Sequence, residues 1–466
     1  MTEEQSVSCA LARFAAGLRI EDLPADVVHQ AVRCLVDWLG CTIAGSATAE
    51  GERVRAGIAA LDAGDGSRTA PIVGSRQRTG IGYAALANGI AAHVLDFDDT
   101  FNPERTTIHG SAPLWPAIIA AAELVPVTGR AAVEAFVAGF EVQTRVAVAA
   151  GPGHYDVGWH VTGTVGHIGA AAATARLLNL SPEQTLAAMG TGATQAAGMK
   201  VVYGSMGKSL HPGKAAMDGL LSGFLARDGF TSSPEPIEGH RGFLHLFSPD
   251  PVPSRALEGL GSTWYLPRDG FKPYACGSLT HPPAQALLEL RSQYGLTPDD
   301  VDGVDAYVHD YVKTTTGLAD PRTGLEGKFS IYHVLAVALA DGAALLDQFT
   351  DERVADPALV AIRERIHVHV DPEQHKDSAR VVLTLRDGRT LERHVAHNLG
   401  TPDNPMTDEQ LEEKLIGLAT PVLGGARAKE IAATCWRLLD LADVCTVVDL
   451  SSPEDQSNSE PPGSGR

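Results

Sequence analysis

The stretch that decides the fold is residues 158–230, GWHVTGTVGHIGAAAATARLLNLSPEQTLAAMGTGATQAAGMKVVYGSMGKSLHPGKAAMDGLLSGFLARDGF, in which three Ala/Gly-rich runs alternate with short polar turns. Small side chains allow helix backbones to approach closely, so these runs predict the tightly packed helical centre of a domain. His160 precedes the first run, and Lys208 and His211 lie at the start of the third. Because helix N-termini favour anions, histidine and lysine at helix starts indicate the wall of an active site.

The overall composition is that of a globular protein, with 44% apolar and 20% charged residues. No run of about 18 apolar residues occurs, so we expect no membrane association. A net charge of −20 argues against nucleic-acid binding and requires that a site for an acidic ligand gather cations locally. The six scattered cysteines and an N-terminus without a basic region predict reduced thiols, no secretory signal and a cytoplasmic location.

The pattern of the chain changes at about residue 264, which divides the 466 residues into expected domains. Residues 1–263 are predicted to be helical, with many helices and short loops. Strand candidates with alternating apolar and polar residues follow at 301–312, 365–371, 380–388 and 389–397, with a hairpin turn at 386–389. We therefore expect a mainly α chain with a smaller α+β domain at 264–400, helices at 401–450 that pack back on the first domain, and a disordered tail at 451–466.

Residues 96–100, DFDDT, place three carboxylates at the end of a helical run. Acidic residues at a helix C-terminus oppose the helix dipole, which favours a role in a substrate site over a solvated helix end. A magnesium–diphosphate site of the isoprenoid-synthase kind is an alternative, but the second metal motif that it needs, N-x-x-[ST]-x-x-x-E, is missing downstream.

Three further motifs are weak. Ser205-x-x-Lys208 matches penicillin-interacting serine acyl enzymes over four residues, without their later Lys-Thr-Gly element. The glycines at 163, 166 and 169 follow no strand and lack dinucleotide-loop spacing, so they favour helix packing. Cys276 with His281 could form a partial metal site, and no complete metal-ligand motif is found.

The remaining candidates are polar residues in turns between apolar helices: Asp96, Thr100, His109, His160, Lys208 and His281. Histidines and a lysine can bind a polycarboxylate through charge-assisted hydrogen bonds and can move protons near neutral pH. Lys208, near a helix start, would hold carboxylates and stabilise the enediolate that forms as a C–H proton leaves.

Six segments together resemble the MmgE/PrpD family, which includes 2-methylcitrate dehydratase, cis-aconitate decarboxylase and iminodisuccinate epimerase. They are AAHVLDFDDT, HGSAPLWPA, GWHVTGTVGHIGAAAATARLL, GSMGKSLHPGKAAMDGLLSGFLARDGFTS, FKPYACGSLTHP and KFSIYHVLAVALADG. The resemblance implies a large all-helical domain built from both chain ends, an inserted α+β lid domain and a homodimer. It also implies a site between the domains that uses no metal or organic cofactor.

The resemblance also assigns roles, with Asp96 and Thr100 in the site. His160 or His281 would remove a proton α to a carboxylate. The carboxylates would be held by Lys208 and His109. Beside these residues we expect the neighbouring cations Arg105 and Lys272, together with Tyr332 and His333, to contribute to substrate binding. The decarboxylase branch has a tyrosine in the helix where this chain has His333, with Tyr332 one place earlier, and a shorter loop between Thr100 and His109.

These two departures favour dehydration over decarboxylation. We therefore expect a lyase for a small di- or tricarboxylate, first of all a 2-methylcitrate dehydratase-like enzyme. Epimerisation of an amino-dicarboxylate, cis-aconitate decarboxylation and a non-catalytic derivative of the fold are the alternatives.

Overall fold

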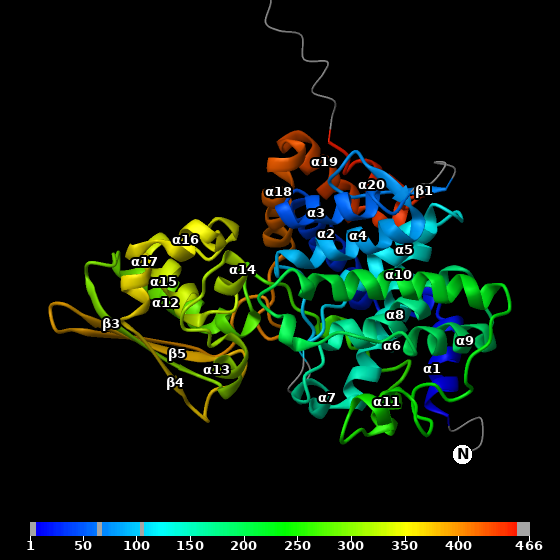
Figure 1. Cartoon of the computed structure of the whole chain (residues 1–466), viewed down its shortest axis with the longest axis horizontal. Coiled ribbons are helices and arrows are strands. Elements are labelled where there is room, and N and C mark those ends of the chain that lie inside the picture. Colours follow the sequence, from blue (N-terminus) through cyan, green and yellow to red (C-terminus); the bar gives the residue numbers. More distant parts are fainter. Residues whose placement is uncertain (1–5, 63–67, 103–106, 454–466) are drawn as a thin grey trace, which may run out of the picture.

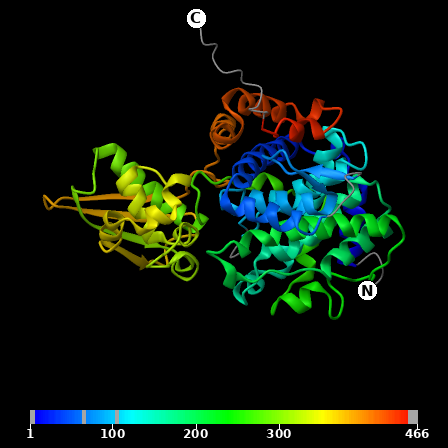
Figure 2. The ribbon, with the colours of Figure 1, turned by 45° about the horizontal axis from the view of Figure 1, so that its top comes forward.

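The computed structural model describes residues 6–62, 68–102 and 107–453 and has two parts, a large helical domain and a smaller domain around a sheet (Figure 1). The large domain contains the helices of the first 270 residues together with α18, α19 and α20 from the other end of the chain. Figure 2 shows the same separation from another side, with the C-terminal helices against the N-terminal ones. The fold class, mainly α with a smaller α+β domain, is confirmed.

The helices of the large domain include several long ones and some single turns. They are α1 (Val7–Gly17), α2 (Ala25–Ser46), α3 (Ala49–Ala59), α4 (Ile81–Val94), α5 (Ser111–Ala122), α6 (Gly129–Ala150), α7 (Pro152–Asp156), α8 (Val161–Leu177), α9 (Pro182–Ala193), α10 (Gly207–Arg227), α11 (Phe243–Phe247), α18 (Asp408–Leu423), α19 (Gly425–Trp436) and α20 (Cys445–Asp449). Short 3-10 helices of this domain lie at Ile20–Asp22, Lys200–Val202, Pro253–Leu257, Leu266–Arg268 and Leu438–Asp440, and those of the smaller domain lie at Ser278–Thr280 and Leu346–Phe349.

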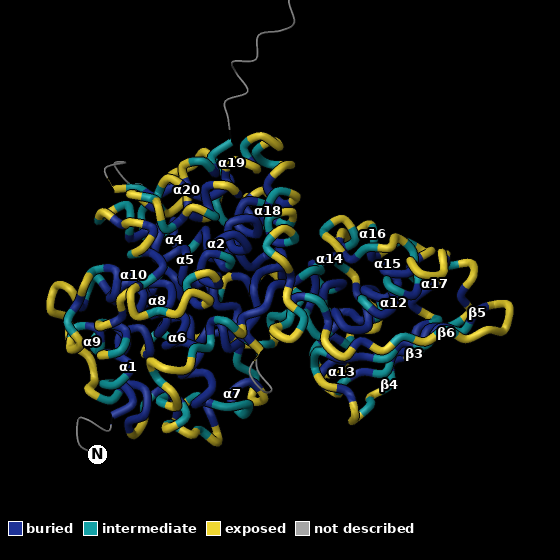
Figure 3. The backbone as a smooth tube through the Cα atoms, turned by 180° about the vertical axis from the view of Figure 1, so that it is seen from behind, coloured by how far each residue is buried: buried dark blue, intermediate teal, exposed yellow. Residues whose placement is uncertain are grey.

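Helix α8 lies at the centre of the large domain, and all its residues are buried (Figure 3). It packs against α10, where an added methyl group on Gly219 would overlap the Cβ of Ala170. Gly89 of α4 and Gly213 of α10 pack together in the same way. The small residues of the central stretch therefore allow three helices to approach within backbone contact, which brings the first turn of α10 close to the end of α4.

Replacing Gly219 with alanine is expected to lower the free energy of unfolding by about 1–3 kcal/mol, because the new methyl group overpacks the α8–α10 contact. Gly57 on α3 is the matched control, since a methyl group there meets no atom within 4 Å. Gly57→Ala should instead be neutral or stabilising by up to about 1 kcal/mol through helix propensity. Urea denaturation of both variants tests this, and wild-type stability of Gly219→Ala would contradict the packing described.

The large domain also holds a small sheet, which the expectation of an all-helical domain missed. Strands β1 (Thr69–Pro71) and β2 (Arg78–Gly80) pair antiparallel, with Ala70 opposite Thr79. These strands are only three residues long, too short for the alternation of apolar and polar residues to be visible in the sequence.

The smaller domain, called the lid below, has a four-stranded sheet with helices packed against it (Figure 1). Its helices are α12 (His281–Tyr294), α13 (Asp310–Thr316), α14 (Gly324–Gly327), α15 (Ile331–Asp341), α16 (Asp351–Ala355) and α17 (Pro357–Arg363). Its strands, in the spatial order β4-β3-β5-β6, are β3 (Val301–Val308), β4 (Ile366–Val370), β5 (Ala379–Leu385) and β6 (Thr390–Val395). β3 pairs parallel with β4, and β5 pairs antiparallel with β3 and β6. The predicted hairpin between the last two strands is confirmed.

The chain crosses between the two domains twice, and the two crossings pair with each other. On the first crossing Gly270 forms a β-bridge with Thr100, and the N–H of Phe271 donates to the carbonyl of Gly400 on the second crossing, at 2.9 Å. Gly400 has a φ of 92°, and a Cβ there would overlap the Phe271 carbonyl, so only glycine fits. Lys272 therefore lies on a crossing that hydrogen bonds hold in place.

Each domain has its own large core of apolar side chains, and a few residues of α2 and α4 join the lid core. Within the described part of the chain, no helix combines the length and the apolar character needed to cross a bilayer. All six cysteines are free, and four of them are buried. The tail expected at 451–466 lies, from residue 454 onward, outside the described residues.

Candidate active site

Asp96 follows helix α4 and adopts a left-handed backbone conformation, with a φ of 51°. Its N–H donates to the His93 carbonyl at 3.1 Å, as in a helix end that glycine usually completes. A non-glycine residue in this conformation costs about 1–2 kcal/mol. The chain thus keeps a carboxylate at a position where glycine would relieve strain, which is typical of a functional residue.

Two buried ammonium groups hold the Asp96 carboxylate. Lys208 Nζ, from the first turn of α10, lies 2.6 Å from Asp96 Oδ1, and Lys272 Nζ lies 3.2 Å from the same oxygen. Burial opposes the ionisation of Asp96, but these ammonium groups outweigh it and hold the pKa of the carboxyl well below its usual range. Asp96 is therefore ionised at neutral pH.

A third buried lysine, Lys328, donates to the carbonyls of Leu95 and Ala275, both at 2.7 Å. Burial lowers its pKa to about 8, with partial compensation from Asp96. We call Lys208, Lys272 and Lys328 the lysine cluster. Its positive charge exceeds that of the one carboxylate it contacts, which favours an anionic ligand.

Four imidazoles, called the imidazole cluster, lie beside the lysines. His93 Nδ1 at the end of α4 lies 2.8 Å from Asp98 Oδ2, and His109 Nδ1 lies 3.3 Å from the same oxygen. The His93 ring centre is 4.3 Å from that of His109 and 5.5 Å from that of His160. His160, the residue before α8, has its Nδ1 2.8 Å from Nδ1 of His211 on α10.

Burial lowers the pKa of all four imidazoles. The pKa of His93 falls to about 3 and that of His211 to about 4. The pKa of His109 is lowered, and that of His160 lies well below its usual range because Lys208 adds to the effect of burial. At neutral pH the rings are therefore uncharged, and each can accept a proton at its bare nitrogen.

Several buried polar atoms in this region have no hydrogen-bond partner among the described residues. They are Nε2 of His93, Nε2 of His160, Nδ1 of His109, Oδ2 of Asp96 and Oδ1 of Asp98. The His109 nitrogen nevertheless lies 3.3 Å from Asp98 Oδ2, within ion-pair distance. Because buried polar groups are nearly always partnered, this concentration is typical of a place where a polar ligand or water binds.

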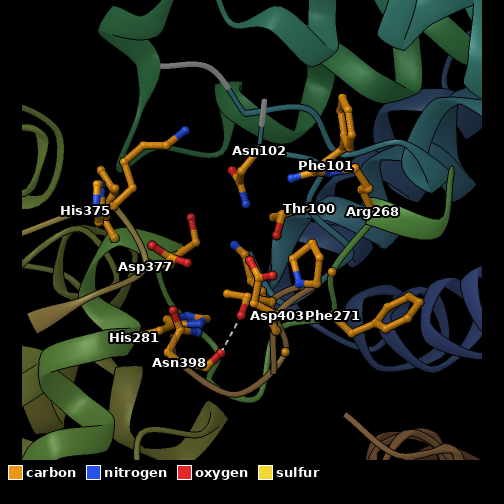
Figure 4. A pocket seen from close by; sticks show the side chains of 18 of the residues that line it. Thr100, Phe101, Asn102, Arg268, Phe271, His281, His375, Asp377, Asn398 and Asp403 are labelled. Atoms are coloured by element: carbon orange, nitrogen blue, oxygen red, sulfur yellow. Dashed lines mark hydrogen bonds between the residues drawn. The ribbon is translucent and has the colours of Figure 1, made fainter. Parts of the chain in front are cut away.

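A cavity of about 600 Å³ lies between the two domains (Figure 4). Thr100 and Lys272 line it from the helical domain, and His281, at the start of α12, lines it from the lid. Burial, and then the charge of Lys272, lowers the pKa of His281 to about 3. Lys272 connects this cavity with the lysine cluster, because the same ammonium group contacts Asp96.

Not every predicted site residue lies in one cavity. Asp96 and Lys208 line a second, smaller cavity of about 20 Å³, which they share with His93 and Lys328. The structure thus brings Asp96, Lys208 and Lys272 into direct contact and packs His109 and His160 next to them. Thr100 and His281 face the larger cavity.

Two predicted substrate-binding residues belong to the lid interior. His333 lies on α15, where its Nε2 is 2.9 Å from the Gln348 carbonyl and its Nδ1 is 3.2 Å from the Arg363 guanidinium. Tyr332 packs against the lid core. The contacts found for both residues in the described structure lie within the lid and not at the lysine or imidazole cluster, and their role in substrate binding stays a prediction. The position of Arg105 lies outside the described residues.

The three carboxylates of DFDDT do not converge on one point, as a diphosphate site would require. Asp96 faces the lysines and Asp98 faces the histidines. Asp99 accepts from the Ser111 N–H at 2.9 Å and interacts with Asp269, and burial raises the pKa of Asp99 to about 7. The sequence could not separate these three environments, because adjacent positions on a non-helical segment point in unrelated directions.

The other weak motifs also have structural explanations. Ser205 Oγ is exposed and donates to the Val202 carbonyl at 2.6 Å, while Lys208 contacts Asp96, so the two do not form an acylating pair. Cys276 Sγ pairs with Thr280 Oγ1 at 3.2 Å, and His281 Nε2 lies 3.1 Å from the Cys276 carbonyl.

A metal ion is the competing ligand for the imidazole cluster. One ring nitrogen each of His93, His109 and His160 lies within 4.8 Å of the others, so the three could surround a small cation. After burial, however, the charge of Lys208 is among the causes that lower the pKa of each of the three. Asp98 acts on the pKa of His93 and of His109 more strongly than Lys208 and in the opposite direction, so these rings lie between a buried carboxylate and a buried ammonium group.

Comparison with known proteins defines the family. The MmgE/PrpD N-terminal domain model matches residues 9–256, and the MmgE/PrpD C-terminal domain model matches residues 274–438. The chain belongs to the MmgE/PrpD family. This confirms the resemblance seen in the six sequence segments.

Curated members of the MmgE/PrpD family match this chain over nearly its whole length. The cis-aconitate decarboxylase-like protein oryM of Aspergillus oryzae is 30% identical, covering 97% of this chain and 98% of its own. The cis-aconitate decarboxylase of Aspergillus terreus is 27% identical, over 96% of each chain. The human cis-aconitate decarboxylase is 26% identical, over 98% of this chain and 97% of its own. At the level of the family, these matches support a lyase role.

Four members of the site were not assigned from the sequence: His93, Asp98, His211 and Lys328. His93 lies within an apolar helical run, where a single histidine resembles a core residue, and only its spacing of five residues from Asp98 hinted at the contact. His211 was noted at a helix start but received no role. Lys328 precedes α15 with no local motif, so only the fold reveals it.

Proposed function

We propose that this MmgE/PrpD protein is a lyase that acts without a metal or organic cofactor on a small polycarboxylate, and that it decarboxylates cis-aconitate or a close analogue. The observation that carries the proposal is the buried lysine cluster beside unpartnered imidazole nitrogens. The full-length matches to cis-aconitate decarboxylases support this choice of reaction. The dehydration expected from the sequence becomes the second candidate.

The geometry suits the chemistry of both candidates. When a carboxylate leaves as CO2, the electron pair of the broken C–C bond must be delocalised into a neighbouring carboxylate and then take up a proton at carbon. Lys208 and Lys272 would stabilise that negative charge in a site with little water. His160, whose Nε2 is buried and unpartnered, would supply the proton in decarboxylation or remove one in dehydration.

One observation favours dehydration. The resemblance implies a tyrosine in the decarboxylase branch where this chain has His333. Here the His333 ring forms hydrogen bonds with Gln348 and Arg363 of the lid. A hydroxyl group is thus missing at that position. A 2-methylcitrate-like substrate, which loses an α-proton and a β-hydroxyl, would not need it for the first step.

Incubation of the purified protein with cis-aconitate, 2-methylcitrate and amino-dicarboxylates in D2O, followed by NMR, separates the candidates. Loss of CO2 with a deuterium on the product carbon supports decarboxylation. A new vinyl signal from the hydroxy acid, without loss of CO2, supports dehydration. Deuterium entry without net change indicates epimerisation, and no reaction with the whole panel indicates a non-catalytic derivative of the fold.

We also propose that the protein is a homodimer in the cytoplasm. The dimer rests on the family resemblance, and the location is supported by six free cysteines. Sedimentation velocity tests the dimer, and a single species of monomer mass at micromolar concentration would contradict it.

A further inference from the structure

The contact between His160 and His211 links the candidate site to a second imidazole that no role has yet explained. Their Nδ1 atoms are 2.8 Å apart. At this distance one nitrogen must carry a hydrogen and the other must be bare, because two N–H groups or two lone pairs would repel. The pair therefore shares one proton along the line between the rings.

The two rings differ in what lies on their other sides. His160 is 1% exposed, and its Nε2 is unpartnered beside His93 and His109. The backbone N–H of His160 donates to the Gly198 carbonyl at 3.0 Å, which fixes the residue at the start of α8. His211 is only partly buried and packs against the segment around Gly198. One ring thus faces the site, and the other lies toward the protein surface.

We propose that His160 and His211 form a two-imidazole proton relay between the bound substrate and solvent, with His211 as its outer member. The relay rests on the proposed lyase function, and it serves either candidate reaction.

In dehydration, the substrate C–H bond breaks and His160 Nε2 gains the proton, while the electron pair forms the C=C bond and the β-hydroxyl leaves as hydroxide. The Nδ1–H bond of His160 breaks as that proton moves to Nδ1 of His211, and the Nε2–H of His211 is released to water. In decarboxylation the same steps run in reverse, and His160 Nε2 gives its proton to the carbon that bears the electron pair. Water then supplies a proton to His211 Nε2.

The electrostatics of the pair keep both rings uncharged between proton transfers. Burial and Lys208 lower the pKa of both rings, that of His211 to about 4. A positive charge on His160 would be unfavourable so close to Lys208, so a proton taken up there is passed on. Because the pKa of His211 is low, that ring in turn gives its proton readily to water.

The test compares His211→Asn with the wild type. The side-chain amide of asparagine can still hydrogen-bond to His160 Nδ1 but cannot carry a proton across. We expect kcat to fall by about 10- to 100-fold, with little change in KM, and exogenous imidazole to restore part of the rate. If the role of His211 were purely structural, we would expect neither a fall in kcat at nearly constant KM nor a recovery of the rate on addition of imidazole.

His167→Asn on α8 is the matched control. This buried ring has its Nδ1 2.7 Å from the Gly163 carbonyl and its Nε2 3.1 Å from Asp218 Oδ2, outside the relay. The kcat of the His167→Asn variant should stay close to the wild-type value and should not change when imidazole is added. Wild-type kcat in His211→Asn, or a loss that imidazole does not restore, overturns the relay.

A second readout needs no turnover. In protein labelled with 15N at histidine Nδ1, the proton between His160 and His211 should give a downfield resonance that His211→Phe abolishes and His167→Asn retains. Its absence from the wild type overturns the relay. A wild type that shows this resonance but turns over no polycarboxylate contradicts the proposed function instead.

Discussion

Replacing Lys208 with methionine is expected to lower kcat/KM by at least about 100-fold, the usual cost of removing one group that stabilises developing negative charge. Methionine keeps the unbranched hydrocarbon chain and removes the ammonium group that lies 2.6 Å from Asp96 Oδ1. The site then loses one of its three buried ammonium groups, and the pKa of Asp96 rises because its largest stabilising charge is gone. Steady-state kinetics on the substrate found in the NMR panel measure the effect.

Lys214→Met is the matched control for Lys208→Met. Lys214 lies on the same helix, and its half-exposed side chain pairs with Asp218 and shares no ion pair with the lysine cluster among the described residues, so its replacement should leave kcat/KM within about 3-fold of wild type. Lys208→Met activity above a tenth of the wild-type value would remove Lys208 from the substrate-binding role. Thermal unfolding of both variants separates a loss of activity from a loss of folded protein.

Acidification is expected to destabilise the fold strongly between about pH 6.5 and pH 4, because in this range the unfolded chain binds more protons than the folded chain does. The buried imidazoles with a lowered pKa include His93 and His281, at about 3, and His154 and His333, at about 4. Their ordinary pKa is 6.5, so each binds a proton in the unfolded state first. The stability that they contribute is therefore present above pH 6.5 and lost as the pH falls.

Asp99 and Asp269 act in the opposite direction. Burial raises the pKa of Asp99 to about 7 and that of Asp269 well above its usual value, so the folded state holds protons that the unfolded state releases. The described imidazoles with a lowered pKa outnumber the described carboxyls with a raised pKa, so the unfolded chain binds more protons than the folded chain and the free energy of unfolding falls on acidification. The buried titratable groups together therefore make the folded protein less stable at acidic pH.

Urea denaturation at pH values from about 7.5 down to about 5.5 tests this slope. His154→Gln should reduce it by about 1.4 kcal/mol per pH unit, because one titrating ring is removed. His154 is a suitable choice because its ring bonds to the Phe247 carbonyl and Thr164 Oγ1, away from the lysine cluster. Unfolding free energy that is constant or rises on acidification would show that the buried imidazoles are protonated in the folded state.

The sequence predicted the parts of the site that lie in polar turns. Asp96, His160 and Lys208 were recognisable because a titratable side chain beside glycine or at a helix boundary stands out from the apolar pattern. Lys272 was also assigned, and the structure brings it to the Asp96 carboxylate. The helical centre followed from alanine and glycine runs, whose packing consequence is general.

The parts that could not be predicted depend on which way a side chain points. His93 and His333 both lie in apolar helical runs, yet one faces the site and the other faces the lid core, bonded to Gln348. Helical periodicity places such residues on a face but does not say what that face meets. The pairing of Asp99 with Asp269 joins positions 170 residues apart, which no local pattern reports.

The paired crossings at Phe271 and Gly400 make the lid an exchangeable module. Because the chain leaves and re-enters the helical domain at neighbouring points, a segment from about residue 274 to 398 can be excised and replaced without stretching either end. Chimeras that carry the lid of a decarboxylase relative would keep Asp96, Lys208 and Lys272 and exchange His281. Substrate preference would then be set jointly by the residues of the helical domain, which stay the same, and by those of the lid, which can be exchanged.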